Sequence, residues 1–138
     1  MNTISVRGGN KKQRELVEDV VFWCIDYMMP RLRTLDIDIN LKKIDDAEGY
    51  CLALSSREFE IEIDNRIKKE DDFITCVIHE MVHVWQYAYR LLKDTHTKQY
   101  WKGKDYTDTP YSKQPWEQQA YRLQEILYKL YLNWEEYL

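Results

Sequence analysis

Two histidines and a glutamate lie close together in the segment VIHEMVHVWQ, residues 77–86. His79 and His83 are four residues apart, and Glu80 directly follows the first of them. In a helix this spacing places both imidazoles on one face, one turn apart, as two ligands of a single metal ion require. On a helical wheel the apolar residues of this segment gather on the opposite side. The pattern therefore predicts a metal site, although two solvent-facing histidines are the simpler alternative.

The chemistry of such a site follows from its donor atoms. Zn²⁺ suits neutral imidazole nitrogen and has no redox chemistry of its own. Glu80 is too close in sequence to the two histidines to complete the same coordination sphere, so we expect it to take a proton from a metal-bound water. Attack of that water on a carbonyl is amide hydrolysis, with Glu80 as general base and later proton donor to the leaving amine. Hydrolysis of another bond is one alternative, and a catalytically inactive, metal-stabilised protein-binding module is the other.

A catalytic zinc ion usually has three protein ligands and one open position, so a third ligand is needed. His96 is the only other histidine and follows His83 by thirteen residues. Glu117 lies in QPWEQQAYR, at the start of the last helix that the sequence predicts. A carboxylate there also favours a helix N-terminus. The residues alone therefore leave Glu117 and His96 as alternatives.

The elements that must position these residues are indicated by hydrophobic periodicity. Residues 11–29 have apolar side chains at three- and four-residue steps, which predicts an amphipathic helix. Alternation over 35–42, a short apolar run at 50–54 and alternation over 58–64 predict three strands, and their short connections favour an antiparallel meander. Residues 1–10 contain a glycine pair and no periodicity, which indicates a flexible tail.

The helix that carries the histidines is expected to have Asp71 or Asp72 as its N-cap and to run to about residue 93. The stretch 94–114 has little helical pattern, but its segment YWKGKDY is a candidate hairpin. Pro115 then opens a final helix with a continuous apolar stripe. Together these elements predict an α+β fold.

The composition is that of one domain spanning residues 1–138. Hydrophobic residues make up 44% of the chain, and five Trp, eleven Tyr and three Phe can fill a core. The net charge of −4, without a basic cluster or a long apolar run, predicts no nucleic-acid partner and no membrane association. The chain has three cysteines, an odd number, and they are widely spaced: Cys24, Cys51 and Cys76. This pattern does not favour a disulfide framework, so we expect buried thiols. Together with the absence of a secretory signal, they favour a cytoplasmic protein.

The segment HEMVHVWQ resembles the active-site helix of the HExxH zincin metallopeptidases. The order of strands, HExxH helix and later glutamate-bearing helix is similar to that of the minimal gluzincins. The W-x-G, Tyr and P-W-E-x-x-A elements of YWKGKDYTDTPYSKQPWEQQAYRLQ resemble a group of small, often phage-borne metallopeptidases. The resemblance covers roughly residues 72–127. It implies a zincin-like fold, a peptide or protein substrate, and one catalytic Zn²⁺ held by His79, His83 and Glu117.

A second resemblance, to the SprT-like metalloproteases, favours His96 instead. Those proteins have a third histidine about a dozen residues after the HExxH motif, usually followed by glycine. Thr97 stands at the position of that glycine here. The chain also lacks the basic or DNA-binding additions of family members that act on DNA–protein crosslinks. The P-W-E-x-x-A element therefore makes Glu117 the preferred third ligand.

The zincin resemblance also assigns a role to the sheet. In zincins an edge strand that precedes the metal helix pairs with the substrate backbone, and the candidate here is EFEIEID, residues 58–64. Its glutamates either form a plain solvent-exposed face or line a cleft, where they would favour basic substrate side chains.

A transition-state oxyanion usually needs a hydrogen-bond donor besides the metal. The sequence offers five candidates and favours none of them: Tyr87, Arg90, Tyr106, Tyr111 and Tyr121. Neither the identity of the substrate nor the oligomeric state follows from these residues.

Overall fold

The alternating segments form a four-stranded mixed sheet. In the computed structural model, which describes residues 1–136, its strands are β1 (Thr3–Gly8), β2 (Asp36–Lys42), β3 (Gly49–Ala53) and β4 (Glu58–Asp64). Their order is β1-β2-β4-β3, and only the β3–β4 pair is antiparallel. The predicted three-stranded meander was therefore wrong. The connections from β2 to β3 and from β3 to β4 are short, yet they allow β4 to fold back between the other two strands. In this interior position the inward side chains of β4 are at most 2% exposed.

The first ten residues contribute a strand rather than a flexible tail, which corrects the prediction. β1 pairs in parallel with β2 over its whole length. Its Ile4 and Val6 pack against the core, whereas the residues between them are exposed. The glycine pair belongs to the turn that follows, where Gly8 and Gly9 have φ angles of 81° and 55°. β1 has only two inward apolar residues and ends beside two glycines, so its alternating pattern is too short to be recognised from the sequence.

Helix α1 (Lys11–Met28) agrees with the predicted amphipathic helix. Its N-terminus has a reciprocal capping box, in which the Asn10 side chain accepts from the Gln13 backbone and the Gln13 side chain accepts from the Asn10 backbone. Helix α3 (Pro115–Glu136) begins at the predicted proline. Tyr131 of α3 is 2% exposed, and its hydroxyl donates to Asp19 of α1 over 2.6 Å. The last helix is thereby joined to the first.

Helix α2 (Glu70–Ala88) carries the two histidines, but its ends differ from the prediction. Lys69 occupies the N-cap position without a side-chain hydrogen bond, and Asp71 and Asp72 lie in the first turn, where carboxylates interact favourably with the helix dipole. The helix ends at Ala88 because Arg90 adopts a left-handed conformation, with φ of 60°. The predicted continuation to residue 93 was therefore wrong.

A small second sheet follows α2. Its antiparallel strands are β5 (Leu92–Asp94), β6 (Gln99–Trp101) and β7 (Lys104–Asp105). The predicted hairpin in YWKGKDY is confirmed as β6 and β7, and Gly103 in its turn has φ of 83°. A 3₁₀ turn, η1 (Tyr111–Lys113), then leads into α3.

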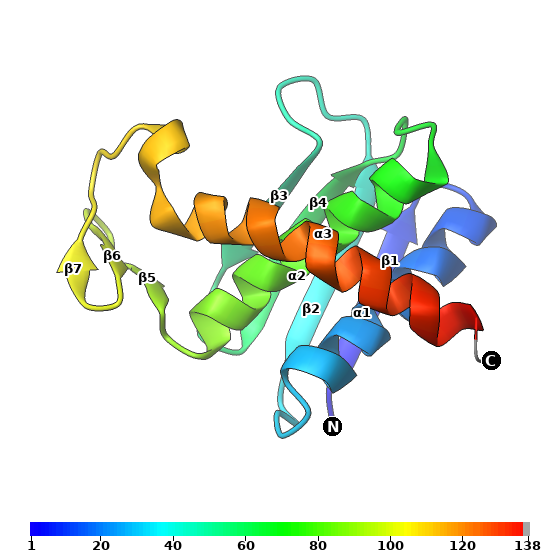
Figure 1. Ribbon diagram of the computed structural model, residues 1–138, viewed down its shortest axis with the longest axis horizontal. Coiled ribbons are helices and arrows are strands. Elements are labelled where there is room, and N and C mark those ends of the chain that lie inside the picture. Colours follow the sequence, from blue (N-terminus) through cyan, green and yellow to red (C-terminus); the bar gives the residue numbers. More distant parts are fainter. Residues whose placement is uncertain (137–138) are drawn as a thin grey trace.

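The helices are stacked over one face of the large sheet, and α2 is at the centre of the molecule. Inward residues of β2 and β4 pack against α1 and α2, while α3 crosses α2 on the side away from the sheet (Figure 1). Cys24 and Cys76 are buried thiols as predicted, whereas Cys51 is only partly buried. Within residues 1–136, no helix has the length and apolar character needed to cross a membrane.

Candidate metal centre

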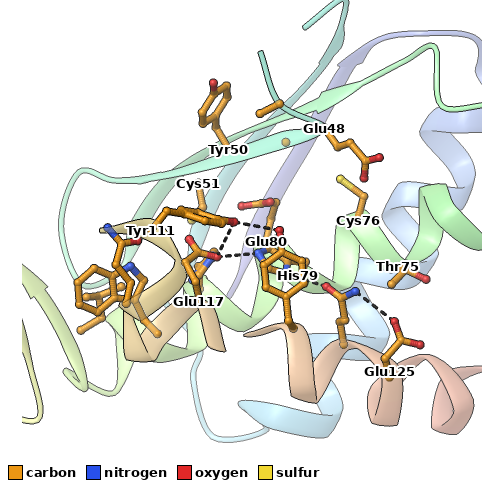
Figure 2. A pocket seen from close by; sticks show the side chains of 18 of the residues that line it. Glu48, Tyr50, Cys51, Thr75, Cys76, His79, Glu80, Tyr111, Glu117 and Glu125 are labelled. Atoms are coloured by element: carbon orange, nitrogen blue, oxygen red, sulfur yellow. Dashed lines mark hydrogen bonds and ion pairs between the residues drawn. The ribbon is translucent and has the colours of Figure 1, made fainter. Parts of the chain in front are cut away.

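His79, His83 and Glu117 converge on one point. The Nε2 atom of His79 lies 3.0 Å from Oε1 of Glu117, and Nε2 of His83 lies 3.1 Å from the same oxygen. One ligand atom from each residue lies within 4.8 Å of the others. The histidines come from successive turns of α2, and Glu117 comes from the first turn of α3, where the two helices cross (Figure 2). The three side chains form a group that could hold a metal ion.

The alternative third ligand lies elsewhere. His96 is exposed in the turn between β5 and β6 and does not line the cavity that contains the other histidines. The two histidines of α2 are only 8% and 6% exposed, so they are not the solvent-facing pair of the simpler alternative. Among the described residues, Glu117 rather than His96 completes the group.

Two glutamines fix which ring nitrogen of each histidine faces this group. Nδ1 of His79 lies 2.7 Å from Oε1 of Gln124, and Nδ1 of His83 lies 2.8 Å from Oε1 of Gln86. The Gln86 side chain is fully buried, and its Nε2 donates to the backbone oxygen of Trp116 and to Oε1 of Gln119. Its oxygen must therefore face His83. Because an amide oxygen only accepts, both Nδ1 atoms carry the proton.

This tautomer leaves three electron-rich atoms facing one another. In the neutral rings both Nε2 atoms present lone pairs toward the Glu117 carboxylate, an arrangement that requires a proton or a metal cation at its centre. Burial opposes ionisation of Glu117, but when a ring Nε2 carries the proton, hydrogen bonding from His79 and His83 outweighs burial and holds the Glu117 pKa at about 2. Burial also disfavours the imidazolium of His83, but Glu117 raises its pKa above the ordinary value. Two imidazole nitrogens and one carboxylate oxygen are a donor set that suits Zn²⁺.

Glu80 lies beside the ligand group but is not part of it. It is 5% exposed, and its carboxylate has no hydrogen-bond partner among residues 1–136. Burial raises the pKa of Glu80, and the attraction of His83 and His79 only partly offsets this effect. A buried carboxylate with a raised pKa, facing a cavity, has the properties of a general base.

Strand β3 approaches Glu80 closely at Gly49. A Cβ atom at Gly49 would lie 3.1 Å from Oε2 of Glu80 and 3.1 Å from Sγ of Cys76. Because glycine has no side chain, β3 can approach α2 here without displacing the Glu80 carboxylate.

All four site residues face a cavity of about 930 Å³. The cavity lies between β3 with its preceding loop on one side and η1 with α3 on the other, and α2 forms its base (Figure 2). Its volume is in the range of ligand-binding clefts.

Of the five candidate oxyanion donors, Tyr111 and Tyr121 reach the ligand group. The Tyr111 hydroxyl donates to Oε1 of Glu117 over 3.3 Å and lies 2.9 Å from the Tyr121 hydroxyl, while the Tyr121 ring packs against His79. Tyr87 lines the cavity, but its hydroxyl donates to Asp94. The two remaining candidates, Tyr106 and Arg90, do not line the cavity.

The strand that borders the cavity is β3 and not β4, which corrects the expectation for residues 58–64. β4 is an interior strand, and Glu58 and Glu60 are exposed and do not line the cavity, so the plain solvent-exposed alternative holds for them. The bond from the Asp64 amide to the Glu48 carbonyl sets the β3–β4 register. In that register Gly49, Cys51 and Ala53 turn their N–H and C=O groups away from β4, toward the open edge.

Sequence reasoning missed Gln86 and Gln124. Gln86 follows His83 by three residues and so lies on the same helical face, which is a usable signal. Gln124 lies two helical turns after Glu117 on α3, and only the crossing of α2 and α3 brings it to His79.

Comparisons of the chain with protein-family models, with curated proteins and with solved structures found no match.

Proposed function

We propose that the protein is a zinc-dependent metallopeptidase with a zincin-like fold, which hydrolyses peptide bonds. The observation that carries this proposal is the convergence of His79, His83 and Glu117 beside the unpartnered carboxylate of Glu80. The three converging side chains would hold the ion. When bound, zinc would act as a Lewis acid that lowers the pKa of water to about 7 and polarises the substrate carbonyl.

Glu80 is the proton acceptor in this proposal. Its buried carboxylate has no competing hydrogen bond, so it is free to take a proton from water and to return it to the leaving amine. Burial favours the protonated acid, which assists the return of the proton. The hydroxyl of Tyr111, which donates to Glu117, and the hydroxyl of Tyr121, which lies beside that of Tyr111, are the candidate donors to the developing oxyanion.

The open edge of β3 provides the means of holding an extended substrate. The outward N–H and C=O groups of Gly49 and Cys51 border the cavity and can pair with a peptide backbone, as the edge strand does in the zincins that the chain resembles. Pairing there would bring the peptide alongside Glu80, because Gly49 lies next to that carboxylate.

The substitution Glu80→Gln tests this function. We expect the variant to bind one zinc ion per chain, as measured by elemental mass spectrometry, and to lose at least about a hundredfold in hydrolysis of a denatured protein mixture. His96→Ala and Glu60→Gln, both on exposed residues outside the cavity, should keep full zinc content and full activity. A Glu80→Gln variant that hydrolyses the mixture as fast as the wild type would overturn the catalytic role. Wild-type protein that binds zinc but cleaves nothing would indicate a metal-stabilised binding module instead.

A further inference from the structure

The cavity that contains the metal centre is acidic at one end. Its lining there, formed by the loop before β3, the first turns of α2 and the middle of α3, includes five carboxylates: Asp46, Glu48, Asp71, Asp72 and Glu125. Figure 2 shows Glu48 and Glu125 on the same side of His79, with Tyr111 and Glu117 on the other. Within residues 1–136, no lysine or arginine lines the cavity. The negative charge of this end is therefore not neutralised by the lining itself.

Three of these carboxylates have roles within the fold. Asp71 and Asp72 lie in the first turn of α2, where they interact with the helix dipole, and Asp46 lies close enough to Tyr50 to raise the pKa of its hydroxyl. Glu48 and Glu125 have no such role. Glu125 accepts only from the Gln124 amide, over 3.2 Å, and within the described part of the chain neither glutamate forms an ion pair. A concave surface lined by one sign of charge attracts ligands of the opposite sign.

Two independent observations indicate that the cavity beside these carboxylates receives a ligand. Glu80 is 5% exposed, faces the cavity and has no hydrogen-bond partner among the described residues. The outward backbone groups of Gly49 and Cys51 are left open along the same wall. A ligand that pairs with the Glu80 carboxylate must bring hydrogen-bond donors, and one that pairs with the open backbone groups of β3 must have an extended backbone. The flanking carboxylates add a requirement for positive charge.

We propose that the cavity selects extended peptide segments that carry a lysine or arginine, with the cationic group between Glu48 and Glu125. This inference rests on the proposed function, because it takes the ligand to be the peptide substrate. Glu48 directly precedes Gly49, which lies beside Glu80, and Glu125 follows Glu117 by eight residues, or roughly 12 Å along α3. An extended peptide advances about 3.3 Å per residue. The basic residue therefore belongs two or three positions from the bond that is cleaved.

Binding to the inactive Glu80→Gln variant, loaded with zinc, tests the charge preference without relying on turnover. The probes are peptides of one sequence that differ only in having lysine, norleucine or glutamate at a single position, and affinity is measured by fluorescence anisotropy. We expect the lysine peptide to bind about tenfold more tightly than the norleucine peptide at low salt. The advantage should shrink in about 0.5 M NaCl, because the Debye length there is only roughly 4 Å and the charges are screened.

Substitutions of the two glutamates assign the preference to this end of the cavity. In the Glu80→Gln background, Glu48→Gln and Glu125→Gln should each reduce the lysine advantage by about threefold and together abolish it, with norleucine binding unchanged. Both glutamates are exposed, so the variants should fold, and Glu60→Gln on the outer face of the sheet is the matched control. Equal binding of the lysine and norleucine peptides, or an advantage that survives the double substitution, would overturn the inference.

Cleavage by the wild-type protein separates this inference from the proposed function. Cuts in a peptide library that concentrate within three residues of lysine or arginine support both. Cuts without a basic preference overturn the inference and leave the peptidase assignment intact. Lysine-selective binding that depends on Glu48 and Glu125, without any cleavage by zinc-loaded wild type, supports the binding preference and rejects the peptidase assignment.

Discussion

Gln86 shows how a single residue controls the chemistry of its neighbour. Its amide nitrogen is used by Trp116 and Gln119, so its oxygen can only accept from Nδ1 of His83. The lone pair of His83 Nε2 is thereby directed at Glu117 before any metal is bound. A fully buried glutamine costs free energy unless its hydrogen bonds are made, and here all of them serve the orientation of the site.

Replacing Gln86 with leucine should therefore weaken zinc binding without removing a ligand. The change leaves Nδ1–H of His83 without its acceptor and frees the ring to change tautomer. We expect the dissociation constant for zinc, measured by competition with a chromophoric chelator, to rise about 10- to 100-fold. Gln118→Leu, on an exposed residue of α3, is the control and should bind zinc normally. A Gln86→Leu variant that is folded and has wild-type zinc affinity would exclude this role.

The candidate ligands differ in how far sequence could predict them. His79 and His83 could be paired because helix geometry alone places residues four apart on one face. Glu117 is 34 residues from His83, and their meeting depends on where α3 crosses α2. The residues by themselves left Glu117 and His96 open, and only the resemblance favoured Glu117. The contact between Gln124 and His79 also depends on where the two helices cross, and nothing in the sequence indicated that contact.

At the scale of elements, β3 is the strand on which the site depends most. It is an edge strand whose outward backbone groups border the cavity, and Gly49 brings it next to Glu80. The predicted substrate strand was β4, because periodicity indicates which residues alternate but not which strand is at the edge of the sheet. Burial on the inner face decides that question: the inward side chains of β4 are almost fully covered, whereas Cys51 and Ala53, which face the same side on β3, are only partly buried.

Adding a methyl group at Gly49 should impair catalysis while leaving the metal in place. The Cβ atom of Gly49→Ala would lie 3.1 Å from Oε2 of Glu80, so the carboxylate or the strand must shift by a few tenths of an ångström. We expect kcat to fall at least tenfold because proton transfer depends on hydrogen-bond geometry, with zinc content unchanged. The new Cβ would also lie 3.1 Å from Sγ of Cys76 and from the backbone oxygen of Glu62. Combining the change with Cys76→Ala relieves the contact with the thiol and should restore part of the activity. Wild-type kcat in Gly49→Ala would show that Glu80 does not need this space.

Strand β1 contributes to stability rather than to the site, and this too can be tested. Val6 faces the core, whereas Arg7 is exposed on the other side of the strand. We expect Val6→Asp to lower the free energy of unfolding by about 2 kcal/mol or more, because it places a carboxylate against apolar side chains. Arg7→Ser should change it by less than about 0.5 kcal/mol. Urea denaturation followed by tryptophan fluorescence measures both, and equal effects would indicate that residues 1–10 are not docked on the sheet.

At the scale of the whole molecule, the site is made where three separate parts of the chain meet. α2 supplies two candidate metal ligands and the proposed general base, α3 supplies the third candidate ligand, and β3 supplies the open wall. The α+β character and the three helices could be predicted from periodicity, because the apolar residues of each helix recur at three- and four-residue steps. The burial of α2 on all sides from Cys76 to Val84 could not be predicted, because it depends on the packing of α3 over that helix. The parallel pairing of β1, β2 and β4 could not, because it depends on contacts between residues far apart in the sequence.

Because the candidate ligands come from both α2 and α3, metal binding should stabilise the whole fold. A ligand that binds only the folded state at a free concentration 100 times its dissociation constant adds about 2.7 kcal/mol. For a chain of this size we expect the Tm from differential scanning calorimetry to rise by about 10 °C on zinc addition. EDTA should reverse the rise. Glu117→Ala should lose most of it because α3 then supplies no donor, whereas His96→Ala should keep it. A zinc-dependent Tm that survives Glu117→Ala but is lost in His96→Ala would move the third ligand to the β5–β6 turn and disconnect the metal from the crossing of the two helices.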